Sequence, residues 1–79
     1  MPYADKNAHI SFIADYLCQL DYEQVKRACS GNGVALGVLL GFGWDYSPNF
    51  LRRRRLRPKL EEASDASIRG LYDFANCSN

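Results

Sequence analysis

Apolar residues recur at steps of three and four through residues 8–20, and this spacing constrains the fold more than any other feature of the chain. Side chains at this period share one face of a helix and point into a common core. The members of this stripe are Ile10, Ile13, Leu17 and Leu20. The spacing predicts a core-facing helix over residues 8–20, with Asn7 as its N-cap.

A second helix start follows at Asp21. The carboxylate of Asp21 can accept the backbone N–H of Gln24, and the Gln24 side chain can reach back to the Asp21 N–H, which is a capping box. We therefore expect a second helix as far as about Cys29. Residues 30–33 would close it, because Gly and Asn tolerate the positive φ angles of a helix end.

Residues 34–42 are almost all apolar, so periodicity cannot separate a buried helix from a buried strand there. Alanine and leucine at four of the nine positions favour a helix. Gly37 and Gly41 lie four apart, which on a helix would let another backbone approach closely. We expect a helix, with a strand as the alternative.

A turn over residues 43–46 leads into a further helix start. Ser47 is placed as an N-cap and Pro48 as the first helical residue, where its missing N–H is no loss. This helix is expected to end at or before Arg57, because Pro58 disfavours the α conformation in the residue that precedes it.

A last helix is predicted after Ser64 or Asp65, either of which can cap it. Its apolar stripe consists of Ile68, Leu71, Tyr72 and Ala75. The sequence thus predicts an all-α fold, a single small domain over residues 1–79 with four or five short helices and with residues 1–6 and 76–79 frayed. A chain of this length buries only about 60% of its unfolded surface, so a homodimer is an open alternative.

Charge is distributed very unevenly, although the net charge is only +1. Residues 52–59 hold six cations and no acid, whereas the segments on either side are net negative. The planar fork of arginine pairs with phosphate oxygens and with guanine edges. We therefore predict a regulatory protein whose arginine-rich segment contacts DNA, RNA or a nucleoprotein complex. A solvated face neutralised by the acids that follow is the alternative.

A short helix, a glycine-containing turn and a following helix that ends in arginines have the outline of a helix-turn-helix. In that arrangement the start of the second helix meets base edges and the arginines hold phosphates. The expected nucleic-acid contacts are Ser47, Asn49, Arg52, Arg53, Arg54, Arg55, Arg57 and Lys59.

Aromatic residues gather around the same turn. Because Trp and Tyr are enriched at interface hot spots, Trp44, Tyr46 and Phe50 form a predicted docking patch. The runner-up function is a protein-binding inhibitor or adaptor that docks through this patch and matches an acidic protein surface with its arginines. Two other uses stay open: Phe42 and Phe50 in the core with Trp44 as its lid, and stacking on single-stranded bases.

The remaining residues predict no enzyme, no metal site and no cofactor. His9 is the only histidine and has no second ligand at a suitable spacing, and Glu61 and Glu62 are adjacent and do not face each other on a helix. The apolar run over residues 34–44 is interrupted by glycines and falls short of the roughly 20 residues that span a bilayer. No membrane partner is therefore expected.

Three cysteines with no CxxC pair, in a chain without a secretory leader pattern, favour a reducing compartment. We expect a cytoplasmic protein in which Cys18, Cys29 and Cys77 are small core or tail residues.

Overall fold

The computed structural model describes residues 4–36 and 43–78, and these residues form helices and no strand. In chain order the elements are α1 (Lys6–Leu17), α2 (Tyr22–Gly31), the short 3₁₀ helix η1 (Trp44–Tyr46), α4 (Asn49–Glu62) and α5 (Asp65–Ser78). The predicted all-α class is confirmed.

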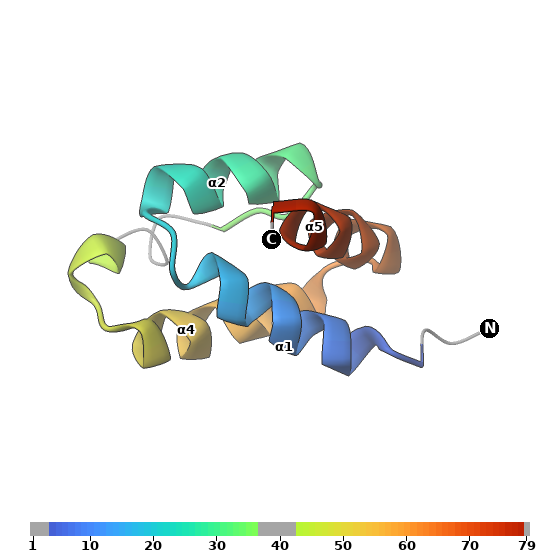
Figure 1. The fold of residues 1–79 in the computed structure, drawn as a ribbon, viewed down its shortest axis with the longest axis horizontal. Helices are drawn as coiled ribbons and strands as arrows, with labels where there is room; N and C mark the ends of the chain where they lie inside the picture. The colour runs from blue at the N-terminus through green and yellow to red at the C-terminus, as the bar shows by residue number, and fades with distance from the viewer. Residues whose placement is uncertain (1–3, 37–42, 79) are drawn as a thin grey trace.

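Helix α1 is the centre of the arrangement, because it packs against both α4 and α5. It runs antiparallel to α4 in the lower layer of Figure 1, while α2 and α5 lie above them. Each α-helix contributes fully buried apolar side chains to one core. These include Ile10, Ile13, Leu17, Val25, Cys29, Leu56, Leu60, Ile68, Leu71 and Ala75.

The first helix begins and ends earlier than predicted. Asp5 occupies the N-cap position without a side-chain hydrogen bond, and the expected cap Asn7 lies inside the helix. The helix stops at Leu17, so Leu20 packs against the core from the connection to α2. A stripe of apolar residues sets which face is buried, but it does not set where the helix stops.

The second helix begins as the sequence predicted. The Gln24 N–H donates to Asp21 Oδ1 over 2.9 Å, and the Asp21 N–H donates to Gln24 Oε1 over 3.3 Å. The helix continues to Gly31, two residues beyond the expected end, and Gly33 takes a φ of 77° just after it. The capping box and the glycine stop are both confirmed.

Residues 34–36 are not helical, contrary to prediction. Val34 donates its N–H to the Cys29 carbonyl over 2.8 Å, which turns the chain back under the end of α2, and both Val34 and Leu36 are buried. The rest of the expected helix, with Gly37 and Gly41, lies outside the described residues. The described residues therefore do not supply the first helix of a helix-turn-helix.

Helix α4 passes through Pro58, where the sequence predicted its end. Proline has no N–H for the carbonyl one turn earlier, and within a helix it costs about 3 kcal/mol. Leu56 and Leu60 on either side are fully buried, and burying a leucine contributes about 1.5–3 kcal/mol, which offsets that cost. Core packing therefore overrides the local preference.

The start of α4 also differs from prediction. Pro48 takes the N-cap position and α4 begins at Asn49. The Ser47 hydroxyl donates to the Gly43 carbonyl over 2.8 Å, closing η1 instead of capping α4.

The last helix is capped by Ser64, whose hydroxyl accepts the Ser67 N–H over 3.2 Å. This confirms one of the two predicted caps, and the helix carries the predicted stripe into the core. Helix α5 continues to Ser78, through residues expected to be frayed.

The three cysteines are free and take the positions expected of core and tail residues. Cys18 and Cys29 are buried and Cys77 is exposed. Burial raises the pKa of the Cys29 thiol from 9.0 to about 11, because the thiolate would lose its hydration.

We expect one fast and two slow thiols when the folded protein is treated with Ellman's reagent at pH 8. Cys77 should react within the mixing phase, whereas Cys29 stays protonated and shielded and should react only through opening of the fold. Unfolding in urea should make all three thiols react fast. Rapid labelling of Cys29 in the native protein would contradict the buried placement.

Gly70 lets the end of α2 approach α5. A Cβ at this position would overlap Asn32 Oδ1, and the Asn32 amide is held by a 2.8 Å hydrogen bond from Nδ2 to the Ala28 carbonyl. Gly31 offers a matched contrast, because a Cβ there would meet no atom within 4 Å.

Gly70→Ala should therefore lower the free energy of unfolding by about 1–2 kcal/mol, since overpacking outweighs the gain in helix propensity. Gly31→Ala should raise it by about 0.5–1 kcal/mol, because only the propensity changes. Urea titration followed by circular dichroism measures both. Equal stability of the two variants would show that Asn32 moves aside without cost.

Candidate functional site

Arg52 does not extend into solvent but binds the backbone of its own chain. Its Nε donates to the Trp44 carbonyl over 2.8 Å and its Nη2 to the Asp45 carbonyl over 3.1 Å. Its Nη1 faces the carbonyls of Cys18 and Leu20 at 3.1 and 3.3 Å. The guanidinium is thus committed to four carbonyls and is not available to clamp a phosphate, which corrects its predicted role.

Arg53 and Arg57 face α1 and are also engaged. Arg53 Nε lies 3.3 Å from Asp15 Oδ1, and Arg57 Nη1 donates to Ser11 Oγ over 3.0 Å. Arg57 also pairs with Glu61 over 3.4 Å. Because residues four apart share a helix face, the two arginines meet two side chains that are also one turn apart on α1.

Lys6, the first residue of α1, contacts the chain just after α4. Its Nζ donates to the Ala63 carbonyl over 3.1 Å and lies 3.0 Å from Asp65 Oδ1. Exposed ion pairs of this kind contribute at most about 1 kcal/mol each. They matter more for the surface charge than for stability, because they neutralise arginines that the sequence alone would assign to contact with a partner.

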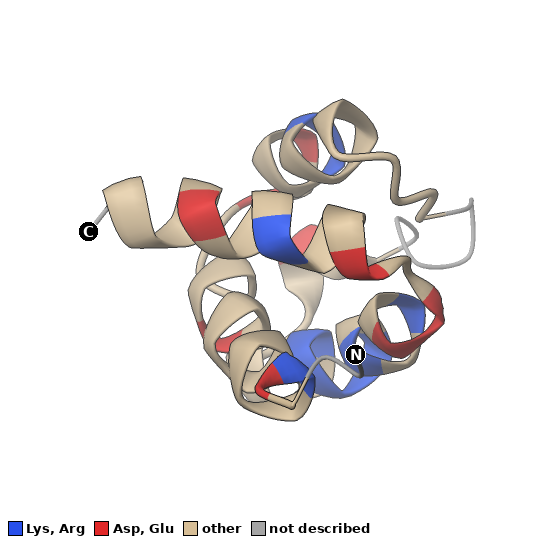
Figure 2. Cartoon of the chain, turned by 90° about the vertical axis from the view of Figure 1, so that its right-hand side faces the viewer, with Lys and Arg blue, Asp and Glu red and all other residues tan. Residues whose placement is uncertain are grey.

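Arg54, Arg55 and Lys59 are the other cations of the run. Arg54 and Arg55 are exposed and Lys59 is half-buried. Arg54 makes no hydrogen bond or ion pair to any described residue. Two residues before the buried Leu56, it lies on the opposite side of α4 from the core. Figure 2 shows the basic residues concentrated on α4, in the lower part of the molecule.

Trp44 is a core residue, which corrects its predicted role as a docking residue. It is 1% exposed, and its indole Nε1 donates to the Leu20 carbonyl over 2.9 Å. The Arg52 guanidinium lies 5.6 Å from its ring centroid and covers it. A side chain in this position offers no surface to a partner.

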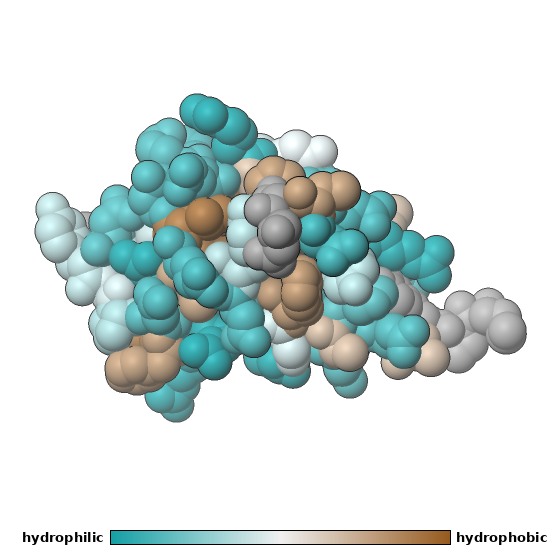
Figure 3. Space-filling view, in the orientation of Figure 1, coloured by the Kyte–Doolittle hydropathy of each residue, from teal (hydrophilic) through white to brown (hydrophobic). Residues whose placement is uncertain are grey.

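Tyr46 and Phe50 remain outside, 95% and 65% exposed. The core alternative for Phe50 is therefore wrong, and Phe42 lies outside the described residues. Phe50 is in the first turn of α4, and Figure 3 shows an apolar patch at the N-terminal end of this helix. Phe50 and Arg54 are four residues apart on one exposed face.

The two predicted base-reading residues lie at the same end. Ser47 is half-buried and holds the Gly43 carbonyl, whereas Asn49 is exposed at the first position of α4. We call Tyr46, Phe50 and Arg54 the η1–α4 surface. It retains two of the three residues of the predicted aromatic patch.

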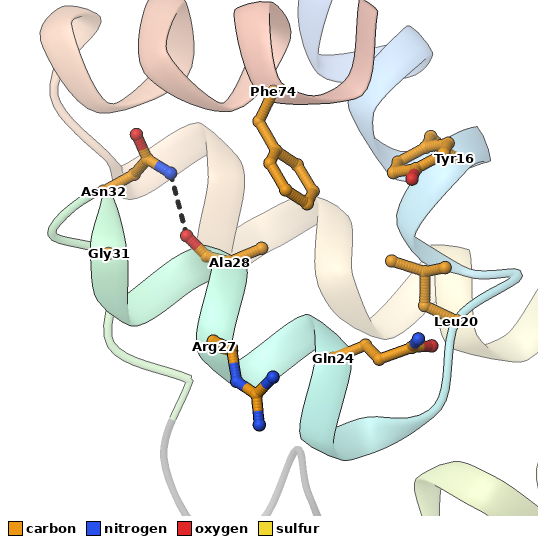
Figure 4. Close-up of a pocket in the computed structure, with 8 residues that line it drawn as sticks. All are labelled: Tyr16, Leu20, Gln24, Arg27, Ala28, Gly31, Asn32 and Phe74. Carbon is orange, nitrogen blue, oxygen red and sulfur yellow. Dashed lines mark hydrogen bonds between the residues drawn. The ribbon is translucent and has the colours of Figure 1, made fainter. Parts of the chain in front are cut away.

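A second feature, which the sequence did not indicate, is a groove of about 430 Å³ between α2, α5 and the end of α1. Figure 4 shows Phe74 of α5 standing above Ala28 of α2, with Tyr16 and Leu20 beside it. The Tyr16 and Phe74 rings meet edge to face at 6.0 Å. The groove joins residues up to 58 positions apart, so no local motif could reveal it.

The other candidate chemistry does not form a site. His9 stacks on Tyr72 with ring centroids 3.8 Å apart. Across residues 4–36 and 43–78, no three His, Cys, Asp or Glu side chains come together as metal ligands. In the same residues no helix combines the length and apolar character needed to cross a membrane.

Comparisons with known proteins add no relative: no family model, curated protein or solved structure matches this chain.

Replacing Arg52 should weaken the fold, whereas replacing Arg54 should not. Arg52→Ala removes charge-assisted hydrogen bonds worth about 1.5–3 kcal/mol each but not additive, so the free energy of unfolding should fall by about 2–4 kcal/mol. Arg54→Ala should change it by less than about 0.5 kcal/mol. Urea unfolding followed by the fluorescence of the single tryptophan measures both.

Arg52→Lys separates charge from geometry. Lysine keeps the charge but lacks the planar fork, so its stability should lie between those of the native chain and Arg52→Ala. If Arg52→Ala and Arg54→Ala were equally stable, the structural role of Arg52 would be wrong.

Proposed function

We propose that the protein is a non-enzymatic binding protein that docks on an acidic protein surface through Tyr46, Phe50 and Arg54. The observation that carries this proposal is the exposure of Tyr46 on η1, and of Phe50 one turn before the outward Arg54 on α4. Tyr and Arg are among the residues that supply most binding energy at protein interfaces, and aromatic residues are enriched there.

The charge of this face supports an acidic partner. Arg54 and Arg55 are exposed on α4, and Arg54 has no acid of the described chain beside it. Complementary charge speeds association and selects partners, while the aromatic side chains bury area in the contact. The η1–α4 surface thus combines exposed aromatic side chains with an exposed arginine over residues 46–54.

Nucleic acid is the second candidate, because an exposed aromatic side chain next to arginine also suits base stacking. It ranks lower, since nucleic-acid affinity depends on many simultaneous phosphate contacts. Arg52, Arg53 and Arg57 bind the chain itself, so at least half of the six cations are already engaged. Arg54 and Arg55 point about 100° apart and cannot follow one phosphate backbone equally well.

A pair of matched variants tests the docking surface. Phe50→Ala and Arg54→Ala should each weaken binding to an acidic protein partner by about tenfold or more, as interface hot spots do. Phe74→Ala and Arg27→Ala remove the same side-chain types from α5 and α2 and should leave the affinity within about twofold, as residues outside an interface do. Biolayer interferometry with immobilised variants measures the four affinities.

Fluorescence anisotropy with duplex DNA, single-stranded DNA and RNA tests whether nucleic acid, rather than an acidic protein, is the partner. The proposal expects no binding tighter than the non-specific range of about 1–100 μM near physiological salt. Tighter binding that falls steeply between 50 and 200 mM salt, and that is lost when Arg54 and Arg55 become Gln, would replace the protein partner with nucleic acid.

A further inference from the structure

The α2–α5 groove has the dimensions and the lining of a small-ligand site. Its volume of about 430 Å³ falls in the usual range of roughly 300–1,000 Å³ for such sites. Leu20 and Ala28 supply aliphatic contact, and Tyr16 and Phe74 supply aromatic faces. Phe74 is 39% exposed, so its ring is held in place yet still accessible.

Among the polar side chains that line the groove are Gln24 and Arg27 of α2. In Figure 4, Arg27 extends from α2 away from Phe74, whereas Gln24 extends along the helix toward Leu20 and accepts the Asp21 N–H. Arg27 is exposed and makes no hydrogen bond or ion pair to any described residue. Glu23, one turn earlier on the same helix, does not pair with it within 4.0 Å. The groove therefore has an unpaired guanidinium beside its apolar side chains.

We propose that this groove binds a small organic carboxylate with an apolar, preferably aromatic, body. The body packs between Phe74, Tyr16 and Ala28, and the carboxylate pairs with the Arg27 guanidinium, whose fork matches its two oxygens. Because Arg27 points away from Phe74, the carboxylate must be carried on a short flexible tail. The limited volume favours a free small molecule over a folded partner.

This site is independent of the η1–α4 surface. The two share no residue, and they use different helices: α1, α2 and α5 for the groove, η1 and α4 for the docking surface. Failure of one proposal therefore leaves the other standing.

The test uses the full chain, labelled with ¹⁵N, and 4-phenylbutyrate as the probe. Its neutral amide, 4-phenylbutyramide, keeps the ring and the tail but removes the charge. We expect the acid to shift the backbone amide signals of Ala28, Gly31 and Asn32 in ¹H–¹⁵N spectra, with a dissociation constant on the order of 1 mM for a probe of this size. The amide should bind at least about fivefold more weakly, since it loses the charge-assisted pair.

Matched variants assign the two halves of the ligand. Arg27→Gln should bring the affinity for the acid down to that for the amide. Lys26→Gln is the control, because it removes the same charge from the neighbouring residue, which does not line the groove. Phe74→Ala should weaken acid and amide alike, and urea unfolding of each variant confirms that the fold is retained.

Three results would overturn the proposal. They are equal binding of acid and amide, equal effects of Arg27→Gln and Lys26→Gln, and signal changes that centre on η1 and α4 or that do not occur at all.

Discussion

The guanidinium of Arg52 organises the end of the molecule on which the rest of the structure depends. It joins three segments: the connection after α1, the 3₁₀ helix η1 and the helix α4 that carries it. The carbonyls of Cys18 and Leu20 lie in the irregular connection after α1, and those of Trp44 and Asp45 lie in η1, where the Trp44 carbonyl also accepts the Ser47 N–H. Leaving such groups unpaired away from water would cost about as much as a lost hydrogen bond each.

Two further hydrogen bonds hold η1 against its neighbours. The Trp44 indole donates to the same Leu20 carbonyl that Arg52 approaches. The Asp45 carboxylate accepts the Tyr22 N–H over 2.9 Å and so binds one of the unpaired donors at the start of α2. Together with the Arg52 hydrogen bonds, they attach η1 to the connection after α1, to α2 and to α4, although η1 is only three residues long.

The exposed aromatic residues follow from this arrangement. With Trp44 directed into the core, Tyr46 falls on another side of the same short helix, because a 3₁₀ helix turns about 120° per residue. Leu56 and Leu60 fix the inner face of α4, and Phe50, six residues before Leu56, then lies about 120° away from it. The position of the η1–α4 surface is therefore a consequence of how the core is packed.

Local features of the fold could be predicted from the sequence, whereas contacts between distant segments could not. The capping box at Asp21 and the cap at Ser64 depend on residues three apart, and the structure confirms both. Passage through Pro58 could not be predicted, because it depends on burial of Leu60 by other helices. The partners of Arg52, Arg53 and Arg57 lie 4–46 residues away along the chain, and four of the seven lie more than 30 away.

The basic run shows why charge along a sequence differs from charge on a surface. Six cations in eight residues suggest one strongly positive face, but a helix distributes successive residues around its axis at about 100° each. Arg52 points toward backbone carbonyls, Arg53 and Arg57 toward α1, and Arg54 toward solvent. A partner therefore meets a weaker and more local field than the sequence implies. If the proposed docking function holds, recognition depends on the exposed aromatic side chains as much as on charge, and such binding should depend on salt less steeply than the contact of six cations with a phosphate backbone.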